Sequence, residues 1–369
     1  MRPLLKGVVW ARIDDQLQLV YDIRDHFLLG DPDGTVEALL RLLREGGRTV
    51  PELAAALAEQ GRPVPVDDLT GAVELLDGNG LLEDGDRLGR LGAGEQERYH
   101  SNLAFFESFS SLARSREDFQ ELLRAAHVLV LGTGGLNSST IPHLCGLGVG
   151  RLTLLDRDAV EPRNFARQYL YRRSDLGASK VTVAADWVRA FDPAVKVEAV
   201  EADINGTSSV TELLDTFAPD VVMSGVDSPV GVDGWVDSAC VRGRVPYVRG
   251  GIHVTQGLVW SVEPGVSACL GCLPDPASLD EDDPGELAAL ALYRSKPRNN
   301  RGIGPVAGLL GALCAFEVLR YLTRFTSPAY AGRPLTIDFA AGCDMRLADP
   351  WPRDPACPTC GAEGGEQTT

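Results

Sequence analysis

The feature that most constrains the fold is an apolar run that ends directly in glycines. The segment HVLVLGTGG (127–135) has the pattern of a buried strand, then a tight turn, then a helix. A second apolar run, RLTLLD (151–156), follows that helix, and the later runs VKVEAVEA, PDVVMSG and PYVRG alternate with helical stretches. This alternation predicts an α/β fold with a doubly wound, mostly parallel sheet of the Rossmann-like kind.

The glycine turn has the position of a phosphate-binding loop. Gly132, Gly134 and Gly135 lie between the predicted strand and helix. Glycines there let a ligand approach the backbone, and the helix N-terminus offers N–H donors and a positive dipole. The turn is therefore predicted to bind a nucleotide, with a tight turn before a packed helix as the alternative.

Charged and polar residues follow the second strand. Asp156 ends that strand, where a carboxylate can accept hydrogen bonds from a ribose. Asp227 follows a later strand and is predicted to hold Mg²⁺. The remaining polar residues of the predicted site are Asn164, Arg167, Gln168 and Lys180. Arg167 and Lys180 supply the cations that a polyphosphate requires. A surface salt-bridge cluster is the alternative for this group.

Two CxxC pairs lie far apart in the chain. They are Cys269/Cys272 and Cys357/Cys360. Four thiolates at tetrahedral positions make a closed, structural Zn²⁺ site with no open ligand for chemistry. Because no export signal is evident, this spacing favours a metal over disulfides or unrelated thiols.

The balance of charge excludes some partners. The chain has 52 acidic and 35 basic residues, for a formal net charge of -17. Such a chain is not expected to bind nucleic acid or an anionic membrane. No apolar run reaches the roughly 20 residues of a membrane-spanning helix. A cytoplasmic protein is expected.

Residues 1–92 are predicted to form a separate, small α+β domain of winged-helix-like outline. Three short strand patterns precede three helical ones, and LLEDGDRLGRLG (81–92) is predicted to form a hairpin wing. The third helix pattern, VDDLTGAVELLDGNG, has four acidic residues and no basic one, which disfavours DNA binding. Peptide recognition by strand addition fits better. Residues 93–362 are predicted as the second domain and 363–369 as a disordered tail.

The motifs resemble a known family. LLDRDAVEPRNFARQ…DLGASK resembles the LLDxDxVxxxNxxRQ…GxxK signature of the ThiF/MoeB/ubiquitin-activating superfamily, and GIGPVAGLLGALCAFEVLRYL resembles a further helix of that family. The resemblance covers about residues 97–360 and implies a ThiF-type, ATP-dependent adenylation domain and a homodimer. It also implies that Asp156 contacts the ribose and Asp227 holds magnesium. Asn164, Arg167 and Lys180 would contact the phosphates.

The sequence departs from the family pattern at three places. Asn137 follows the glycine turn where the family has glycine, and Ser101 stands where the family's RYxRQ motif has its second arginine. After Asp227, the segment SPVGVDGW lacks the usual asparagine and downstream arginine. Substitutes for the missing cation could come from Arg98, Arg114 and Arg116. The segment from Leu273 to Gly304 contains no cysteine, so a thioester step is not expected.

The expected function is adenylation of a peptide or protein C-terminus. The N-terminal pattern resembles the peptide-recognition element of ribosomal-peptide (RiPP) biosynthesis, which also precedes the peptide-adenylating enzyme MccB. The expected partner is a precursor or leader peptide, or else a ubiquitin-like carrier protein. As an alternative, related ThiF-like proteins adenylate nothing and present a leader peptide to a YcaO-type cyclodehydratase. Sulfur-carrier activation for cofactor synthesis is a third reading, disfavoured by the extra domain and the cysteine-free segment.

Overall fold

The chain divides into two compact units. The computed structural model describes residues 1–273 and 302–361, and the units are Met1–Leu122 and Leu123–Thr369. The domain limits 1–92 and 93–362 remain a prediction; here residues 93–122 group with the first unit. The predicted tail and nearly all of the segment between Leu273 and Gly304 lie outside the described residues.

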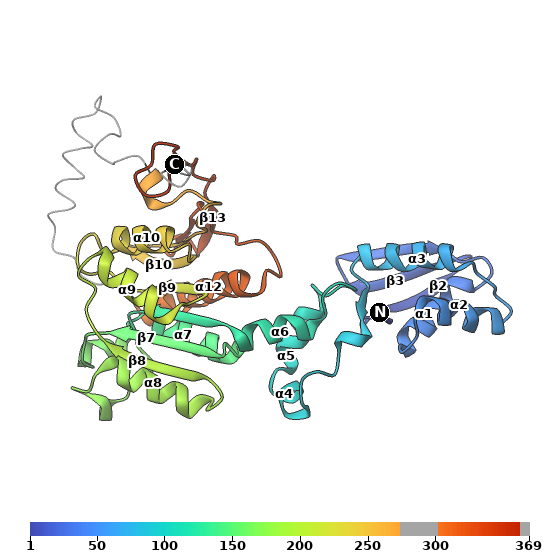
Figure 1. Cartoon of the computed structure of the whole chain (residues 1–369), viewed down its shortest axis with the longest axis horizontal. Coiled ribbons are helices and arrows are strands. Elements are labelled where there is room, and N and C mark those ends of the chain that lie inside the picture. The colour runs from blue at the N-terminus through green and yellow to red at the C-terminus, as the bar shows by residue number, and fades with distance from the viewer. Residues whose placement is uncertain (274–301, 362–369) are drawn as a thin grey trace, which may run out of the picture. The chain divides into compact units, whose positions relative to one another are not determined.

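The first unit combines a small sheet with a layer of helices (Figure 1). Its strands are β1 (Pro3–Leu5), β2 (Val9–Ile13), β3 (Gln16–Asp22), β4 (Asp25–Gly30) and β5 (Leu82–Asp84). Its helices are α1 (Thr35–Glu45), α2 (Val50–Glu59), α3 (Val66–Gly78), α4 (Ala93–Arg98), α5 (His100–Glu107) and α6 (Arg116–Ala125), which crosses the boundary. β3 lies between β2 and β4 in an antiparallel sheet, and alternation along β3 buries Leu17 and Leu19 against leucines of α1–α3.

The predicted hairpin wing is not formed. Instead, β5 pairs antiparallel with β1, so that Pro3 lies opposite Asp84 and Leu5 opposite Leu82. Three residues are too few to show the alternation that identifies a strand. The partner of β5 is therefore a segment about 80 residues away, which local pattern cannot reveal.

The second unit is built on an eight-stranded sheet in the order β13-β12-β11-β10-β9-β6-β7-β8. Its strands are β6 (His127–Leu131), β7 (Arg151–Asp156), β8 (Lys196–Glu201), β9 (Val221–Ser224), β10 (Tyr247–His253), β11 (Gln256–Val262), β12 (Leu335–Asp338) and β13 (Asp344–Leu347). β6 to β10 are parallel, which confirms the predicted fold class, whereas β11–β13 extend the sheet antiparallel.

Helices lie on both faces of this sheet. They are α7 (Asn137–Leu147), α8 (Lys180–Phe191), α9 (Thr207–Phe217), α10 (Val232–Arg242) and α12 (Gly304–Thr323). α9 packs on α10, while α7 packs on α8 and α12 (Figure 1). β6 lies between β7 and β9: the chain passes from β6 to β7 and β8 on one side and then crosses to β9 on the other side of β6. In such sheets ligands bind at the carboxyl ends of the strands at this switch point.

α12 has the length and composition of a membrane span, although no membrane-spanning run was predicted from the sequence. Most of its apolar window is buried within the protein, as in a core helix. Its Glu317 is fully buried and accepts hydrogen bonds from Ser261 Oγ (2.7 Å) and the backbone N–H groups of Ala329 (3.0 Å) and Tyr330 (2.8 Å). Arg320 Nη1 lies 3.0 Å from the same carboxylate. Glu317 thus ties α12 to β11 and to the chain that follows the helix.

A glycine sets the spacing between α12 and α7. A Cβ at Gly311 would lie 2.7 Å from Ser139 Cβ and 2.8 Å from the backbone oxygen of Leu136. Close contact also lets Thr140 Oγ1 donate to the Gly311 carbonyl (3.3 Å). The two helices therefore touch through backbone atoms at this point.

We predict that Gly311→Ala destabilises the protein by about 1–3 kcal/mol, because the added methyl has no room. The matched control is Gly308→Ala in the same helix, where a Cβ would meet no atom within 4 Å. That control should be neutral or stabilising by up to about 1 kcal/mol. Urea unfolding of both variants measures the difference, and equal stabilities would contradict the packing described.

Candidate nucleotide and metal sites

The glycine turn between β6 and α7 lies beside two predicted polar residues, Arg167 and Gln168. Gly132 has φ of 81°, and a Cβ there would lie 3.1 Å from Val226 Cγ1. A Cβ at Gly135 would lie 3.0–3.2 Å from the side chain of Arg167, which therefore lies across the turn. Gln168 Nε2 lies 3.9 Å from the corresponding position at Gly134. Both side chains come from the segment after β7, as the sequence motif requires.

Asp156 ends β7 and holds the same turn. Its Oδ2 accepts the Thr133 backbone N–H (2.7 Å) and the Thr133 hydroxyl (2.9 Å), and its Oδ1 accepts the Asp158 N–H (2.9 Å). The Tyr171 hydroxyl lies 2.7 Å from the Thr133 carbonyl and 2.8 Å from its Oγ1. Burial raises the pKa of Tyr171, so it remains a neutral donor. Thr133 and Tyr171 were not among the predicted site residues, although Thr133 lies in the glycine turn and Tyr171 lies between the two parts of the family signature.

Asn164 and Lys180 flank this network. Asn164 is buried, and its Oδ1 accepts the Glu161 N–H (2.8 Å), which closes the short turn Pro162–Ala166 that precedes Arg167. Lys180 begins α8, and its Nζ donates to Asp158 Oδ2 (2.8 Å) while its side chain is 6% exposed. Lys180 is thus a nearly buried cation with donors left over beside the turn.

Asp227 lies in the segment that joins β9 to α10. It is exposed, and its carboxylate makes no hydrogen bond or ion pair with any residue that the structure describes. The neighbouring Ser228 lies 3.5 Å from Arg157 Nη2, whose guanidinium is held by Asp203. Asp227 therefore stands exposed beyond the carboxyl end of β9, with no partner among residues 1–273 and 302–361, as a metal-binding carboxylate can.

Asn137 stands where the family has glycine, and its side chain forms contacts that a glycine lacks. The side chain is fully buried, and Nδ2 donates to the carbonyls of Leu131 (3.1 Å) and Gly132 (2.7 Å). It fills the space between β6 and β9, because a Cβ at Gly225 would lie 2.6 Å from Nδ2. Asn137 therefore holds the glycine turn by hydrogen bonds and prevents the carboxyl ends of β6 and β9 from approaching more closely.

Unpaired polar atoms gather around this region. In the described part of the chain, six buried side-chain nitrogen or oxygen atoms lack a hydrogen-bond partner. Four of them belong to Asn137 at the start of α7, Gln168 after the turn Pro162–Ala166, Ser179 just before α8 and Ser224 at the end of β9. Buried polar groups are normally satisfied, so this concentration fits a site that a polar ligand completes.

The arginines considered as substitutes for the missing family cation have contacts within the first unit. Arg116 forms ion pairs with the fully buried Glu83 and with Glu107. Arg114 stacks 4.0 Å from the centre of the Phe119 ring. The Arg98 guanidinium lies 5.1 Å from the centre of the Tyr99 ring. Arg116 is therefore committed to a buried ion pair and is not a mobile cation.

The four predicted zinc ligands meet in one cluster. Their sulfurs all lie within 4.8 Å of one another, with Cys269–Cys357 at 3.6 Å, Cys272–Cys360 at 3.3 Å and Cys269–Cys272 at 3.9 Å. Sulfurs around a tetrahedral Zn²⁺ lie about 3.8 Å apart. Burial raises the pKa of Cys269 and Cys360, whereas the N–H groups of Cys360 and Thr359 help to lower the pKa of Cys357 to about 7. The spacing of the four sulfurs suits a thiolate-bound metal.

A carboxylate that the sequence did not single out supports this cluster. Asp237 of α10 is 2% exposed, and its Oδ1 accepts the Leu270 N–H (3.1 Å) and the Tyr247 hydroxyl (2.9 Å). Burial raises the pKa of Asp237, against these hydrogen bonds. Asp237 therefore fixes the first CxxC knuckle onto α10 and β10.

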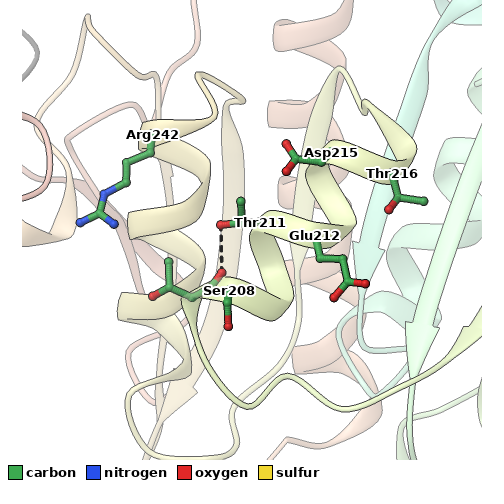
Figure 2. Close-up of a pocket in the computed structure, with 7 residues that line it drawn as sticks. Ser208, Thr211, Glu212, Asp215, Thr216 and Arg242 are labelled. Atoms are coloured by element: carbon green, nitrogen blue, oxygen red, sulfur yellow. Dashed lines mark hydrogen bonds between the residues drawn. The ribbon is translucent and has the colours of Figure 1, made fainter.

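A shallow groove lies elsewhere, between α9 and α10 (Figure 2). Its volume is about 610 Å³, and hydroxyl and charged side chains line it: Thr207, Ser208, Thr211, Glu212, Asp215, Thr216 and Arg242. The Thr211 hydroxyl donates to the Thr207 carbonyl (3.1 Å). None of the predicted nucleotide or metal residues lines this groove.

Comparison with known proteins decides the family. The ThiF family model matches residues 108–359. The chain belongs to the ThiF family. The SAMP-activating enzyme E1 of Haloferax volcanii is 32% identical over 247 residues, which cover 67% of this chain and 84% of that protein. The sulfur carrier protein adenylyltransferase of Thermus thermophilus is 30% identical over 276 residues, covering 73% and 92%.

Solved structures extend the likeness in fold to almost the whole chain. E. coli MccB superposes with a TM-score of 0.77 at 20% identity, covering 98% of this chain and 97% of that one. MccB has also been solved with ATP and, as a microcin C7 biosynthetic enzyme, with N-formylated MccA. The family and the named relatives identify this ThiF-family chain as an adenylyltransferase.

We predict that Asp237→Ala destabilises this adenylyltransferase by about 1–3 kcal/mol, because it leaves a buried N–H and a buried hydroxyl without an acceptor. Asp237→Asn keeps an acceptor oxygen and should cost less than half as much. Urea unfolding of the two variants compares them, and equal losses would show that the hydrogen bonds at Oδ1 are unimportant.

Proposed function

We propose that this enzyme uses MgATP to adenylate the C-terminal carboxylate of a peptide or small protein. The observation that carries the proposal is the position of Arg167 across Gly135 in the turn between β6 and α7. Nearby in the fold are Lys180, paired with Asp158, the exposed Asp227 and the group of buried polar atoms that lack partners among the described residues. Together they supply cations and polar contacts where a doubly wound sheet binds its ligand.

The reaction needs little covalent help from the protein. A substrate carboxylate oxygen attacks the α-phosphorus of ATP, the bond to the bridging oxygen breaks, and pyrophosphate leaves. Arg167 and Lys180 offset the negative charge of the phosphates, and the residues of the turn hold them in line. Asp227 holds the Mg²⁺, which supplies further positive charge at the phosphates.

We propose a ribosomal precursor or leader peptide as the substrate. Within the described residues, β2 and β4 pair only with β3, so each offers an open edge to which an extended peptide can add. The MccB complexes with MccA support a peptide. The names of the sulfur-carrier relatives support a ubiquitin-like carrier protein as the second choice.

A different function is favoured by one observation. Ser101 stands in place of arginine, and Arg116, one of the three arginines that could replace the missing cation, is bound to Glu83 and Glu107. That loss suits a protein that presents a leader peptide to a YcaO-type cyclodehydratase without adenylation. The retained Asp156, Arg167 and Lys180 arrangement opposes it, because a presenter has no need of phosphate-binding residues.

Three further properties belong to the proposal. The cysteine cluster holds one structural Zn²⁺, in agreement with the sulfur spacing. The enzyme acts as a homodimer, the usual state for symmetric soluble oligomers. It works in the cytoplasm, where paired CxxC knuckles stay reduced and bind metal.

We predict that the protein binds MgATP and that Asp227→Ala weakens binding by at least about tenfold, since the metal loses its carboxylate. Asp215→Ala is the charge-matched control, because Asp215 is exposed on α9 beside the groove of Figure 2. Calorimetric titration measures both. Absence of MgATP binding by the folded, metal-loaded protein would favour the presenter over the enzyme, whereas binding justifies a pyrophosphate-exchange search for the peptide.

We predict that each chain holds one zinc ion and that Cys357→Ser loses it. Elemental mass spectrometry of the purified proteins measures the zinc content. Cys343→Ser is the control, because Cys343 is exposed and lies outside the cluster. The first variant should also lower the midpoint of urea unfolding, since a structural metal contributes to folding. Equal zinc content in both variants would contradict the assignment.

A further inference from the structure

Asp156, the carboxylate predicted to contact the ribose, already accepts several hydrogen bonds from within the protein. Asp156 is 8% exposed and accepts three hydrogen bonds. Two reach Oδ2, from the N–H and hydroxyl of Thr133, and one reaches Oδ1, from the N–H of Asp158. A carboxylate offers about four acceptor positions, two on each oxygen. Oδ2 is therefore full, and Oδ1 has room for one more donor.

The Thr133 hydroxyl is not free to leave this arrangement. Thr133 is fully buried, and Tyr171, 5% exposed, places its hydroxyl 2.8 Å from Thr133 Oγ1 and 2.7 Å from the Thr133 carbonyl. When Tyr171 donates to Thr133, the Thr133 hydroxyl proton points to Asp156, and both hydroxyls have acceptors. Breaking it would leave a buried hydroxyl without an acceptor, which is costly.

A ribose offers two adjacent hydroxyl donors, and both would need an acceptor at Asp156 to be recognised there together. The vacancy at Oδ1 accepts one of them. We propose that Thr133 sets the sugar specificity of the nucleotide site: Asp156 recognises a single ribose hydroxyl, and the enzyme accepts a monodeoxy nucleoside triphosphate nearly as well as ATP. This inference rests on the proposed function, because it concerns the same nucleotide.

The test compares the Mg²⁺ complexes of ATP, 2′-deoxy-ATP, 3′-deoxy-ATP and 2′,3′-dideoxy-ATP by calorimetry on the full chain. At least one monodeoxy nucleotide should bind within about threefold of ATP, and the dideoxy nucleotide about tenfold or more weaker, as for loss of one hydrogen bond to a charged group. Affinity for MgATP itself tests the proposed function. The ratios among the four nucleotides test this inference.

Two variants at Thr133 distinguish an effect of its hydroxyl from an effect on folding. Thr133→Val keeps the shape and the backbone N–H but removes the hydroxyl, which frees a position on Oδ2. Both monodeoxy nucleotides should then bind several-fold more weakly relative to ATP than they do in the unmodified protein. Thr133→Ser retains the hydroxyl and should keep the original ratios. The proposal is overturned if the unmodified protein already loses about tenfold with each monodeoxy nucleotide, or if Thr133→Val leaves the ratios unchanged.

Discussion

The position of β6 between β7 and β9 is the constraint on which the site depends. Because the chain crosses to β7 on one side and returns to β9 on the other, the carboxyl ends of three strands meet at one edge. Gly132, Asp156 and Asp227 follow those three ends in turn. Residues about a hundred positions apart in the sequence are thereby placed together without any direct bond between them.

Buried polar groups have two different roles in the second unit. Toward the C-terminal end of α12, Glu317 accepts hydrogen bonds from neighbouring donors and holds the helix to β11 and to the segment after the helix. At the strand ends that α7 and α12 adjoin, Asn137 and Gln168 keep unsatisfied atoms. An unpaired buried polar atom costs stability. Its presence near the glycine turn is therefore better understood as preparation for a ligand than as poor packing.

The sequence predicted those features that depend on local pattern. Alternating strands and helices identified the parallel part of the sheet, and motif spacing identified the glycine turn and the paired CxxC knuckles. The pairing of β5 with β1 and of β12 with β11 depends on distant partners that no local signal names. For the same reason Asp237 was missed: nothing in VDSAC shows that its carboxylate reaches Leu270. The ion pair of Arg116 with Glu83 was equally hidden.

The cysteine cluster joins parts of the chain that are 88 residues apart, with α12, β12 and β13 between the two knuckles. A metal held by all four sulfurs closes a long loop, and restricting such a loop removes freedom mainly from the unfolded chain. Tetrahedral coordination also needs the intervening strands and helix in place. Full metal occupancy would therefore come late in folding, after the second knuckle has been synthesised, and would mark a chain whose C-terminal part has reached its final arrangement.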